Sequence, residues 1–261
     1  MAHSMTLDTR LCLPQVTLCA ITSVNVAATV RALEVSAAQV DFAQILLLTD
    51  AQLYIPHPAI TVVPIAPLRS SVAYSDFLLT QLADHVRTSH CMIAQWDGHL
   101  LDARRWNPTF LDYDYIGASW PQFNDGHDVG NGGFSLRSRR LMDLCRAPEF
   151  VPAHPEDVAV ARTNRNWLEG QGMRFAPRAL ADAFAAERAG DLAASFGYHG
   201  AFNMPRALGR QAFWQAYDEL DELGSIRHDF LLILRHVARG PGGLRRARRM
   251  VADRLRHMVG R

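Results

Sequence analysis

The sequence predicts an α/β protein with a mixed, mostly parallel sheet flanked by helices and a helical C-terminal extension. Short, continuous apolar runs recur through the first half, as expected for strands buried on both faces of a parallel sheet. Segments with helical spacing of apolar residues separate these runs, as βαβ units require. With 261 residues, the chain has room for one large domain and a small appendage. We place the domain at residues 12–203 and the extension at 204–261.

The first part of the chain alternates strand and helix. The predicted strands are 16–21, 44–49, 60–65 and 91–94, and the predicted helices are 26–38 and 74–86. The fourth strand runs directly into the polar turn Gln95-Trp-Asp97-Gly98. In open α/β sheets, ligands bind beyond the carboxyl ends of the strands, so this turn is the first place to expect a site.

The second part is predicted to continue with shorter elements. The first are a helix at 100–111, where Trp106 and Phe110 have helical spacing, a strand at 112–117 and a polar loop at 121–128. Two helices follow, one from Arg139 to Cys145 capped by Ser138 and one beginning near Pro155. A compact turn at 196–200 then leads to helices from Met204 onward. This arrangement predicts one domain followed by an all-helical end.

A glycine-rich stretch at 129–138 divides the chain. Gly130, Gly132 and Gly133 lack the side chains that would keep a ligand away from the backbone. Their spacing matches neither a P-loop nor the dinucleotide-binding fingerprint. Considered alone, the stretch is as typical of a hairpin turn as of a ligand-binding loop.

Three acidic residues and one histidine are the candidates for chemistry. Asp97 follows a strand and is suited to bind a hard cation, or to cap Gly98 or the next helix. Glu156 and Asp157 offer a general base or an acidic ligand, or only favour a helix N-terminus. His199 is suited to bind a metal or phosphate or to carry a proton, although most single histidines have no such role.

Six short motifs in a fixed order strengthen these candidates. They are Gln95-Trp-Asp97, Asp114-Tyr-Ile-Gly-Ala118-Ser-Trp120, Val129-Gly-Asn-Gly-Gly-Phe-Ser-Leu-Arg137, Glu156-Asp157, Ala181-x-x-Phe184-x-x-Glu187 and Phe196-Gly-Tyr-His199. In this order they resemble a bacterial and fungal domain family of unknown function that is similar to GT-A glycosyltransferases, which have a Rossmann-like fold. The resemblance covers residues 16–202.

The resemblance implies a role for each candidate. The implied metal ligands are Asp97 and His199, the implied donor-binding residues are Gln95, Asp97, Asn131, Gly132 and Gly133, and the implied catalytic pair is Glu156 and Asp157, with Asp157 as the base. The implied cofactor is a divalent cation, Mn²⁺ or Mg²⁺. Gln95 replaces the first acid of the GT-A Asp-x-Asp motif, which weakens the case for a metal and leaves Gln95 to bond the donor ribose.

The implied function is transfer of a sugar from a nucleotide-sugar donor to a glycan or lipid-linked acceptor, in bacterial surface polysaccharide biosynthesis. A base placed opposite the leaving diphosphate predicts inversion at the anomeric carbon. The alternative is a noncatalytic domain that binds nucleotides or glycans, which the lost acid at Gln95 favours. A metal-assisted hydrolase is a third class, but the sequence has neither a nucleophile elbow nor a His-rich metal motif.

Composition bears mainly on partners and compartment. The 27 basic residues are all arginine and the net charge is +1, which makes no general case for a nucleic-acid partner, and no base-stacking motif is recognisable. The segment 235–261 carries nine arginines among apolar residues. This pattern suits either an anionic membrane surface or a basic helix packed on its own domain.

Scattered cysteines and the absence of a signal pattern or a bilayer-spanning run lead us to expect a cytoplasmic protein. Peripheral contact on the inner membrane face is one of the two interpretations of the arginine-rich segment 235–261.

Overall fold

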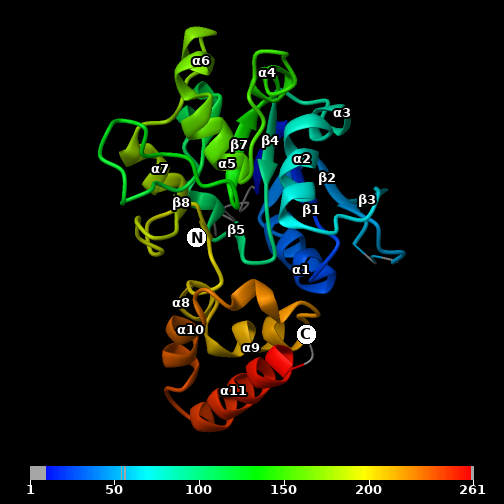
Figure 1. The fold of residues 1–261 in the computed structure, drawn as a ribbon, viewed down its shortest axis with the longest axis vertical. Helices are drawn as coiled ribbons and strands as arrows, with labels where there is room; N and C mark the ends of the chain where they lie inside the picture. The colour runs from blue at the N-terminus through cyan, green and yellow to red at the C-terminus, as the bar shows by residue number, and fades with distance from the viewer. Residues whose placement is uncertain (1–9, 54, 56, 260–261) are drawn as a thin grey trace, which may run out of the picture.

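A six-stranded sheet forms the centre of the computed structural model, which describes residues 10–53, 55 and 57–259 (Figure 1). Its strand order is β3 (Ile60–Pro64), β2 (Val40–Thr49), β1 (Leu11–Ile21), β4 (His90–Ile93), β7 (Ser135–Ser138) and β6 (Tyr115–Ile116). The first four strands are mutually parallel, and β7 is antiparallel to both of its neighbours. The predicted α/β class with a mostly parallel sheet is therefore confirmed.

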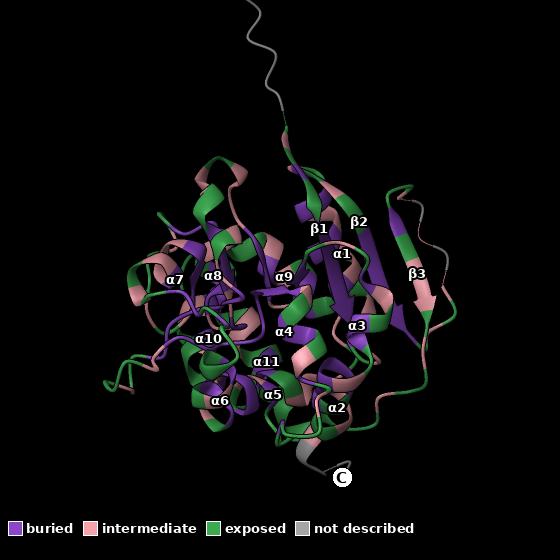
Figure 2. Ribbon diagram, turned by 90° about the horizontal axis from the view of Figure 1, so that it is seen from above, coloured by how far each residue is buried: buried purple, intermediate pink, exposed green. Residues whose placement is uncertain are grey.

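Both faces of the central strands are buried, which explains their continuous apolar runs. Leu18 and Ala20 of β1 pack in the same core as Leu33 of α1 (Val26–Ala37). The alternate residues Cys19 and Ile21 pack on the other face with α2 (Ser71–Thr80). Figure 2 shows the resulting buried interior along β1 and β2.

The predicted helix at 74–86 is interrupted. It forms α2 and a short α3 (Leu82–His85), with Gln81 between them, and α2 begins earlier than expected because Ser70 caps it by accepting a hydrogen bond from the Ala73 N–H. The cap predicted at Ser138 is confirmed, since its Oγ accepts from the Leu141 N–H at 3.1 Å at the start of α4 (Arg139–Leu144).

Two predictions of local structure are wrong. Residues 100–111 were expected to be helical, but Leu100 ends β5 (Gly98–Leu100), and the rest forms two 3₁₀ turns, η1 (Ala103–Arg105) and η2 (Pro108–Asp112). Side chains of Asp102 and Asn107 cap these turns and stop a continuous helix. The expected turn at 196–200 contains the strand β9 (Gly197–His199), which pairs with β5 and with β8 (Ala185–Ala186) in a second small sheet.

Several short helices cover the sheet around β7 and β6. They are α5 (Glu156–Val158), the π-helical turn η3 (Ala159–Thr163), α6 (Arg165–Gly170) and α7 (Arg178–Phe184). The expected helix near Pro155 is therefore present, with Glu156 and Asp157 in its first turn.

The C-terminal extension forms a helical layer at one end of the molecule (Figure 1). Its elements are α8 (Met204–Ala207), α9 (Arg210–Asp218), η4 (Leu223–Ile226), α10 (Phe230–Val237) and α11 (Gly243–Val259). Their core also includes Tyr198 and Ala201, so packing crosses the predicted boundary after residue 203. Among the described helices, none combines the length and apolar composition needed to cross a bilayer.

The extension lies at the carboxyl edge of the sheet. Asn25, just after β1, accepts hydrogen bonds through Oδ1 from the Asp221 and Glu222 N–H groups at 3.1 and 2.9 Å. Trp96, just after β4, packs against the core of the extension. The extension is thus attached beside the edge where a ligand is expected.

Candidate functional site

The turn after β4 turns the chain back toward the sheet edge. The Gln95 and Gly98 backbones exchange hydrogen bonds of 2.8 and 3.0 Å, which closes a tight turn between β4 and β5. With Trp96 held by the extension, the side chains of Gln95 and Asp97 meet His199 at the carboxyl edge. The position predicted from the strand end is the position observed.

His199 comes to this turn because β9 pairs with β5, with Gly98 opposite His199. Its Nε2 lies 3.2 Å from Gln95 Oε1 and 3.8 Å from Asp97 Oδ1. Its Nδ1 lies 3.4 Å from Glu187 Oε1, an ion-pair distance without hydrogen-bond geometry. The structure therefore brings Asp97 and His199 together, as predicted.

Electrostatics favour a positive charge on this imidazole. Burial opposes protonation of His199, but the carboxylates of Asp97, Glu187 and Asp157 outweigh it and raise the pKa to about 9. Burial also raises the pKa of Asp97, an effect that His199 partly offsets. Asp97 Oδ2 in addition accepts a hydrogen bond from the Ala201 N–H at 3.1 Å. The cluster is therefore a protonated histidine held between acidic side chains.

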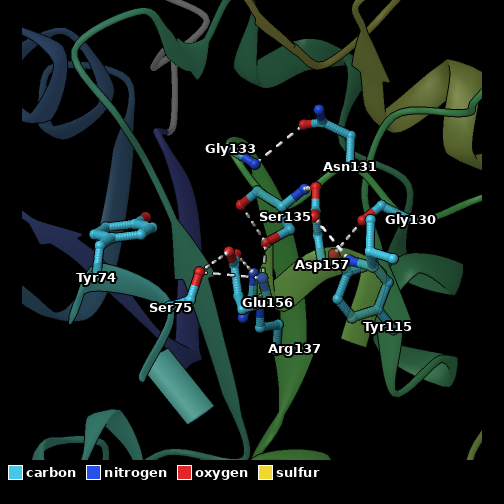
Figure 3. A network of polar contacts seen from close by, with 12 residues as sticks. Tyr74, Ser75, Tyr115, Gly130, Asn131, Gly133, Ser135, Arg137, Glu156 and Asp157 are labelled. Carbon is cyan, nitrogen blue, oxygen red and sulfur yellow. Dashed lines mark hydrogen bonds and ion pairs between the residues drawn. The ribbon is translucent and has the colours of Figure 1, made fainter. Parts of the chain in front are cut away.

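The glycine loop lies directly against the candidate side chains. A Cβ added at Gly133 would lie 2.0 Å from His199 Nε2, and one added at Gly132 would lie 2.6 Å from Glu156 Oε1. These positions therefore need glycine so that the protein's own side chains fit. A role for the same backbone in approaching a donor sugar stays a prediction. Asn131 shapes the loop, because its Oδ1 accepts from the Gly133 N–H at 3.0 Å (Figure 3).

Asp157 contacts this loop at Gly132. Its Oδ2 accepts from the Gly132 N–H at 3.2 Å and its Oδ1 from the Val158 N–H at 2.8 Å. Burial, and then the negative charge of Glu156, raise the pKa of Asp157 to about 6. A carboxylate with this pKa is ionised at neutral pH and is a stronger base than an ordinary aspartate.

Glu156 has a different environment from its neighbour. Its Oε1 forms an ion pair of 3.0 Å with Arg137 Nη2, and the two side chains are only 7% and 3% exposed. Ser75 Oγ donates to Glu156 Oε2 at 3.4 Å (Figure 3). Of the predicted catalytic pair, Glu156 is therefore engaged in a buried ion pair, whereas Asp157 keeps partial exposure.

The sequence predicts no role for several residues that the structure brings to this site. Tyr74 accepts a hydrogen bond at 2.8 Å from Gln95 Nε2, so Gln95 bridges Tyr74 and His199. Glu187 and Arg137 do belong to the motif series, and their charge within otherwise apolar motifs was the available signal. Tyr74 gave no signal, since it lies on an ordinary helical face.

The donor atoms fit a divalent cation only in part. Asp97 Oδ1 and His199 Nε2 are 3.8 Å apart, a separation that two ligands of one cation can have when each bond is about 2.1 Å. Within the described part of the chain, no group of three or more His, Cys, Asp or Glu side chains converges on such a position. Substrate phosphates and water would have to complete the coordination, as they often do for Mg²⁺.

Replacing Gly133 with alanine tests the close contact with His199. The new methyl group must displace the imidazole ring, so we expect a destabilisation of about 1–3 kcal/mol and shifted NMR signals of the His199 ring. Gly170→Ala is the matched control, because a Cβ there meets nothing within 4 Å. Unchanged His199 signals in Gly133→Ala would show that the contact is not tight.

Comparisons with known proteins were made on sequence and on structure. Among solved structures, the chain is similar to the galactosyltransferase LgtC in complex with donor and acceptor sugar analogs, at 14% identity and a TM-score of 0.44, over 79% of this chain and 97% of that chain. An active-site mutant of LgtC gives 13% identity, the same TM-score and the same coverage. Similarity at this level does not carry an activity. No curated protein sequence matches the chain.

The comparison of the sequence with models of protein families identifies one matching family. The sequence model of a family described as "Protein of unknown function (DUF5672)" matches residues 58–199, more than half of the chain. This range contains all six motifs on which the resemblance to a family of unknown function was based. The chain therefore belongs to the DUF5672 family of proteins of unknown function.

Proposed function

We propose that this protein is a glycosyltransferase that moves a sugar from a nucleotide-sugar donor to a hydroxyl group of a glycan or lipid-linked acceptor, with inversion, in bacterial surface polysaccharide biosynthesis. One observation carries the proposal. Asp157, a carboxylate with a raised pKa, contacts the loop at Gly132, and the protonated His199 lies against the adjacent Gly133. Inverting transfer of an activated sugar uses two such groups, a base for the acceptor and a positive charge for the leaving group.

The position of the site in the sheet supports binding of a nucleotide. From β1 the chain proceeds to β2 on one side, whereas β4 lies on the other side of β1. Such a reversal of strand order leaves a crevice at the carboxyl ends of the two strands, which is the usual ligand position in open α/β sheets. At this crevice Thr22 follows β1, and Ala94 and then Gln95 follow β4. In the proposal, Gln95 contacts the donor ribose beside its bonds to Tyr74 and His199.

The histidine cluster would stabilise the leaving group. When the bond between the anomeric carbon and the diphosphate breaks, negative charge develops on the diphosphate, and the electron pair leaves with its oxygen. A protonated His199 next to that oxygen offsets the charge. When a divalent cation is bound, it would be held by Asp97, by His199 in its neutral form and by the donor phosphates, and it would supply the positive charge in place of the imidazolium.

Asp157 would act as the base. It accepts the proton of the acceptor hydroxyl as that oxygen forms the new bond to the anomeric carbon. Asp157 contacts the glycine loop at Gly132, and His199 lies against it at Gly133. In the proposal the sugar lies over these two glycines, with the acceptor on the Asp157 side and the diphosphate on the His199 side. This arrangement predicts inversion of the anomeric configuration. The buried Glu156 acts through its neighbour, since its charge raises the pKa of Asp157.

The pH dependence of turnover follows from this role. Asp157 is active when ionised, so kcat/KM should fall about tenfold per pH unit below its raised pKa of about 6. In the absence of metal, kcat/KM should also fall above about pH 9, where His199 loses its proton. Glu156→Gln removes a negative charge that raises this pKa, so the acidic limb should move to lower pH. An acidic limb that stays in place in Glu156→Gln would assign the titration to another group.

A panel of nucleotide sugars tests the proposal directly. The full chain is incubated with each donor, with and without Mn²⁺ or Mg²⁺, and binding and slow hydrolysis of the donor are followed by NMR. We expect at least one donor to bind and to be hydrolysed or transferred, and any stimulation by metal to be lost in Asp97→Ala. Binding without hydrolysis or transfer under all conditions would identify a noncatalytic binding domain instead.

A further inference from the structure

The last helix, α11, has an apolar face that the rest of the described chain leaves uncovered. Leu244, Val251 and Leu255 are 72%, 40% and 57% exposed. At 3.6 residues per turn, their positions fall within about 40° of one another around the helix. They line a shallow surface hollow of 350 Å³ together with Ala247, Arg248 and Ala252. Met250, on the other side of the helix, is fully buried in the core of the extension.

Arginines accompany this face. The helix carries six arginines and a single acid, Asp253. Four of the arginines have partners within the protein: Arg246 with the Pro241 carbonyl, Arg249 with Asp218, Arg254 over the Phe230 ring, and Arg256 with Asp253. Arg245 and Arg248 are exposed and have no hydrogen bond or ion pair with any residue that the structure describes. They are therefore free to bind an external anionic partner.

Few partners satisfy both the apolar and the cationic groups. A second copy of the chain would cover the apolar residues but would bring two arginine-rich faces together, which like charges oppose. A nucleic acid would pair with the arginines but would leave the leucines in water. An anionic membrane surface accepts apolar side chains at the acyl boundary and pairs arginines with lipid headgroups.

We propose that α11 binds an anionic membrane surface through Leu244, Val251, Leu255, Arg245 and Arg248. The helix lies at the end of the molecule farthest from the central sheet (Figure 1), so it can meet a flat surface without the sheet intervening. The proposal concerns the extension alone and does not depend on the proposed sugar transfer.

Flotation of the full chain with lipid vesicles tests the apolar part. We expect binding to vesicles containing phosphatidylglycerol, weaker binding to pure phosphatidylcholine, and at least about a tenfold loss of binding in the double variant Val251→Glu and Leu255→Glu. The matched control is Val72→Glu with Val151→Glu, which changes two valines that are 57% and 58% exposed outside α11. Unchanged vesicle binding in the α11 variant would overturn the proposal.

Removal of the free arginines tests the charged part. Each arginine near an anionic surface contributes about fivefold to partitioning, so Arg245→Ala with Arg248→Ala should weaken binding about 25-fold. Arg69→Ala with Arg87→Ala removes the same charge elsewhere on the surface and should have little effect. Sedimentation without lipid tests whether the face binds a second copy of the chain instead. If the unaltered protein is a dimer, the Val251→Glu, Leu255→Glu variant is a monomer and neither binds vesicles, the face serves self-association and the membrane proposal is wrong.

Discussion

Asp157→Asn is expected to lower kcat by about 10²–10⁴-fold while the fold and donor binding stay nearly intact. The amide cannot take the proton of the acceptor hydroxyl, but its oxygen can still accept a backbone hydrogen bond from Gly132 or Val158. The measurement is transfer or donor hydrolysis by the purified variant, with donor affinity measured in parallel.

The control for this prediction is a carboxylate of the same kind outside the site. Asp76 is exposed on α2, and Asp76→Asn removes one negative charge without touching the glycine loop. We expect its kcat to equal that of the unaltered protein. A kcat in Asp157→Asn close to the unaltered value would show that the base lies elsewhere.

Arg137→Met is expected to lower the free energy of unfolding by about 3–5 kcal/mol. The substitution leaves the carboxylate of Glu156 buried without its ion-pair partner, and the arginine also lies over the Tyr115 ring at 5.5 Å. Chemical denaturation measures the loss. The rest of the site should suffer as well, because Glu156 lies next to Asp157 and against Gly132.

A double variant separates the ion pair from the packing. Arg137→Met combined with Glu156→Leu removes both charges, and much of the lost stability should return because no buried charge remains unpaired. A double variant as unstable as Arg137→Met alone would show that packing, and not the unpaired carboxylate, causes the loss.

The sheet and the position of the site follow from local sequence. Continuous apolar runs mark strands that are buried on both faces, and β1, β2 and β4 are such strands. Asp97 follows one of them, so its place at the carboxyl edge is predictable without knowledge of any other contact. The cap at Ser138 is also predictable from local sequence, because its hydrogen bond joins Ser138 to Leu141, three residues further along the chain.

The composition of the site depends on pairings that no local pattern reveals. His199 reaches Gln95 because β9 pairs with β5, about a hundred residues away in the sequence. Arg137 and Glu156 form their ion pair across β7 and α5. The glycines illustrate the same limit: composition shows that Gly132 and Gly133 permit a close approach, but not that Glu156 and His199 make it.

Aromatic spacing misleads for a related reason. Trp106 and Phe110 are four residues apart, as on one side of an α-helix, yet no α-helix joins them: the chain leaves η1 at Arg105 and begins the 3₁₀ turn η2 at Pro108. Their rings meet edge to face at 5.2 Å, and Phe110 makes a second such contact with Phe184. Tertiary packing of the rings therefore gives the same spacing that a helix would give.

The central claim is that Asp157, as the base, and His199, at the leaving group, act on opposite faces of a sugar that lies over the glycine loop. The most direct measurement is the anomeric configuration of the first product formed from a donor that the protein uses, read from the coupling of the anomeric proton in NMR. Inversion relative to the donor is the predicted result, because Asp157 and His199 then act on opposite faces of the sugar. Retention of configuration would contradict the claim and remove Asp157 from the role of in-line base.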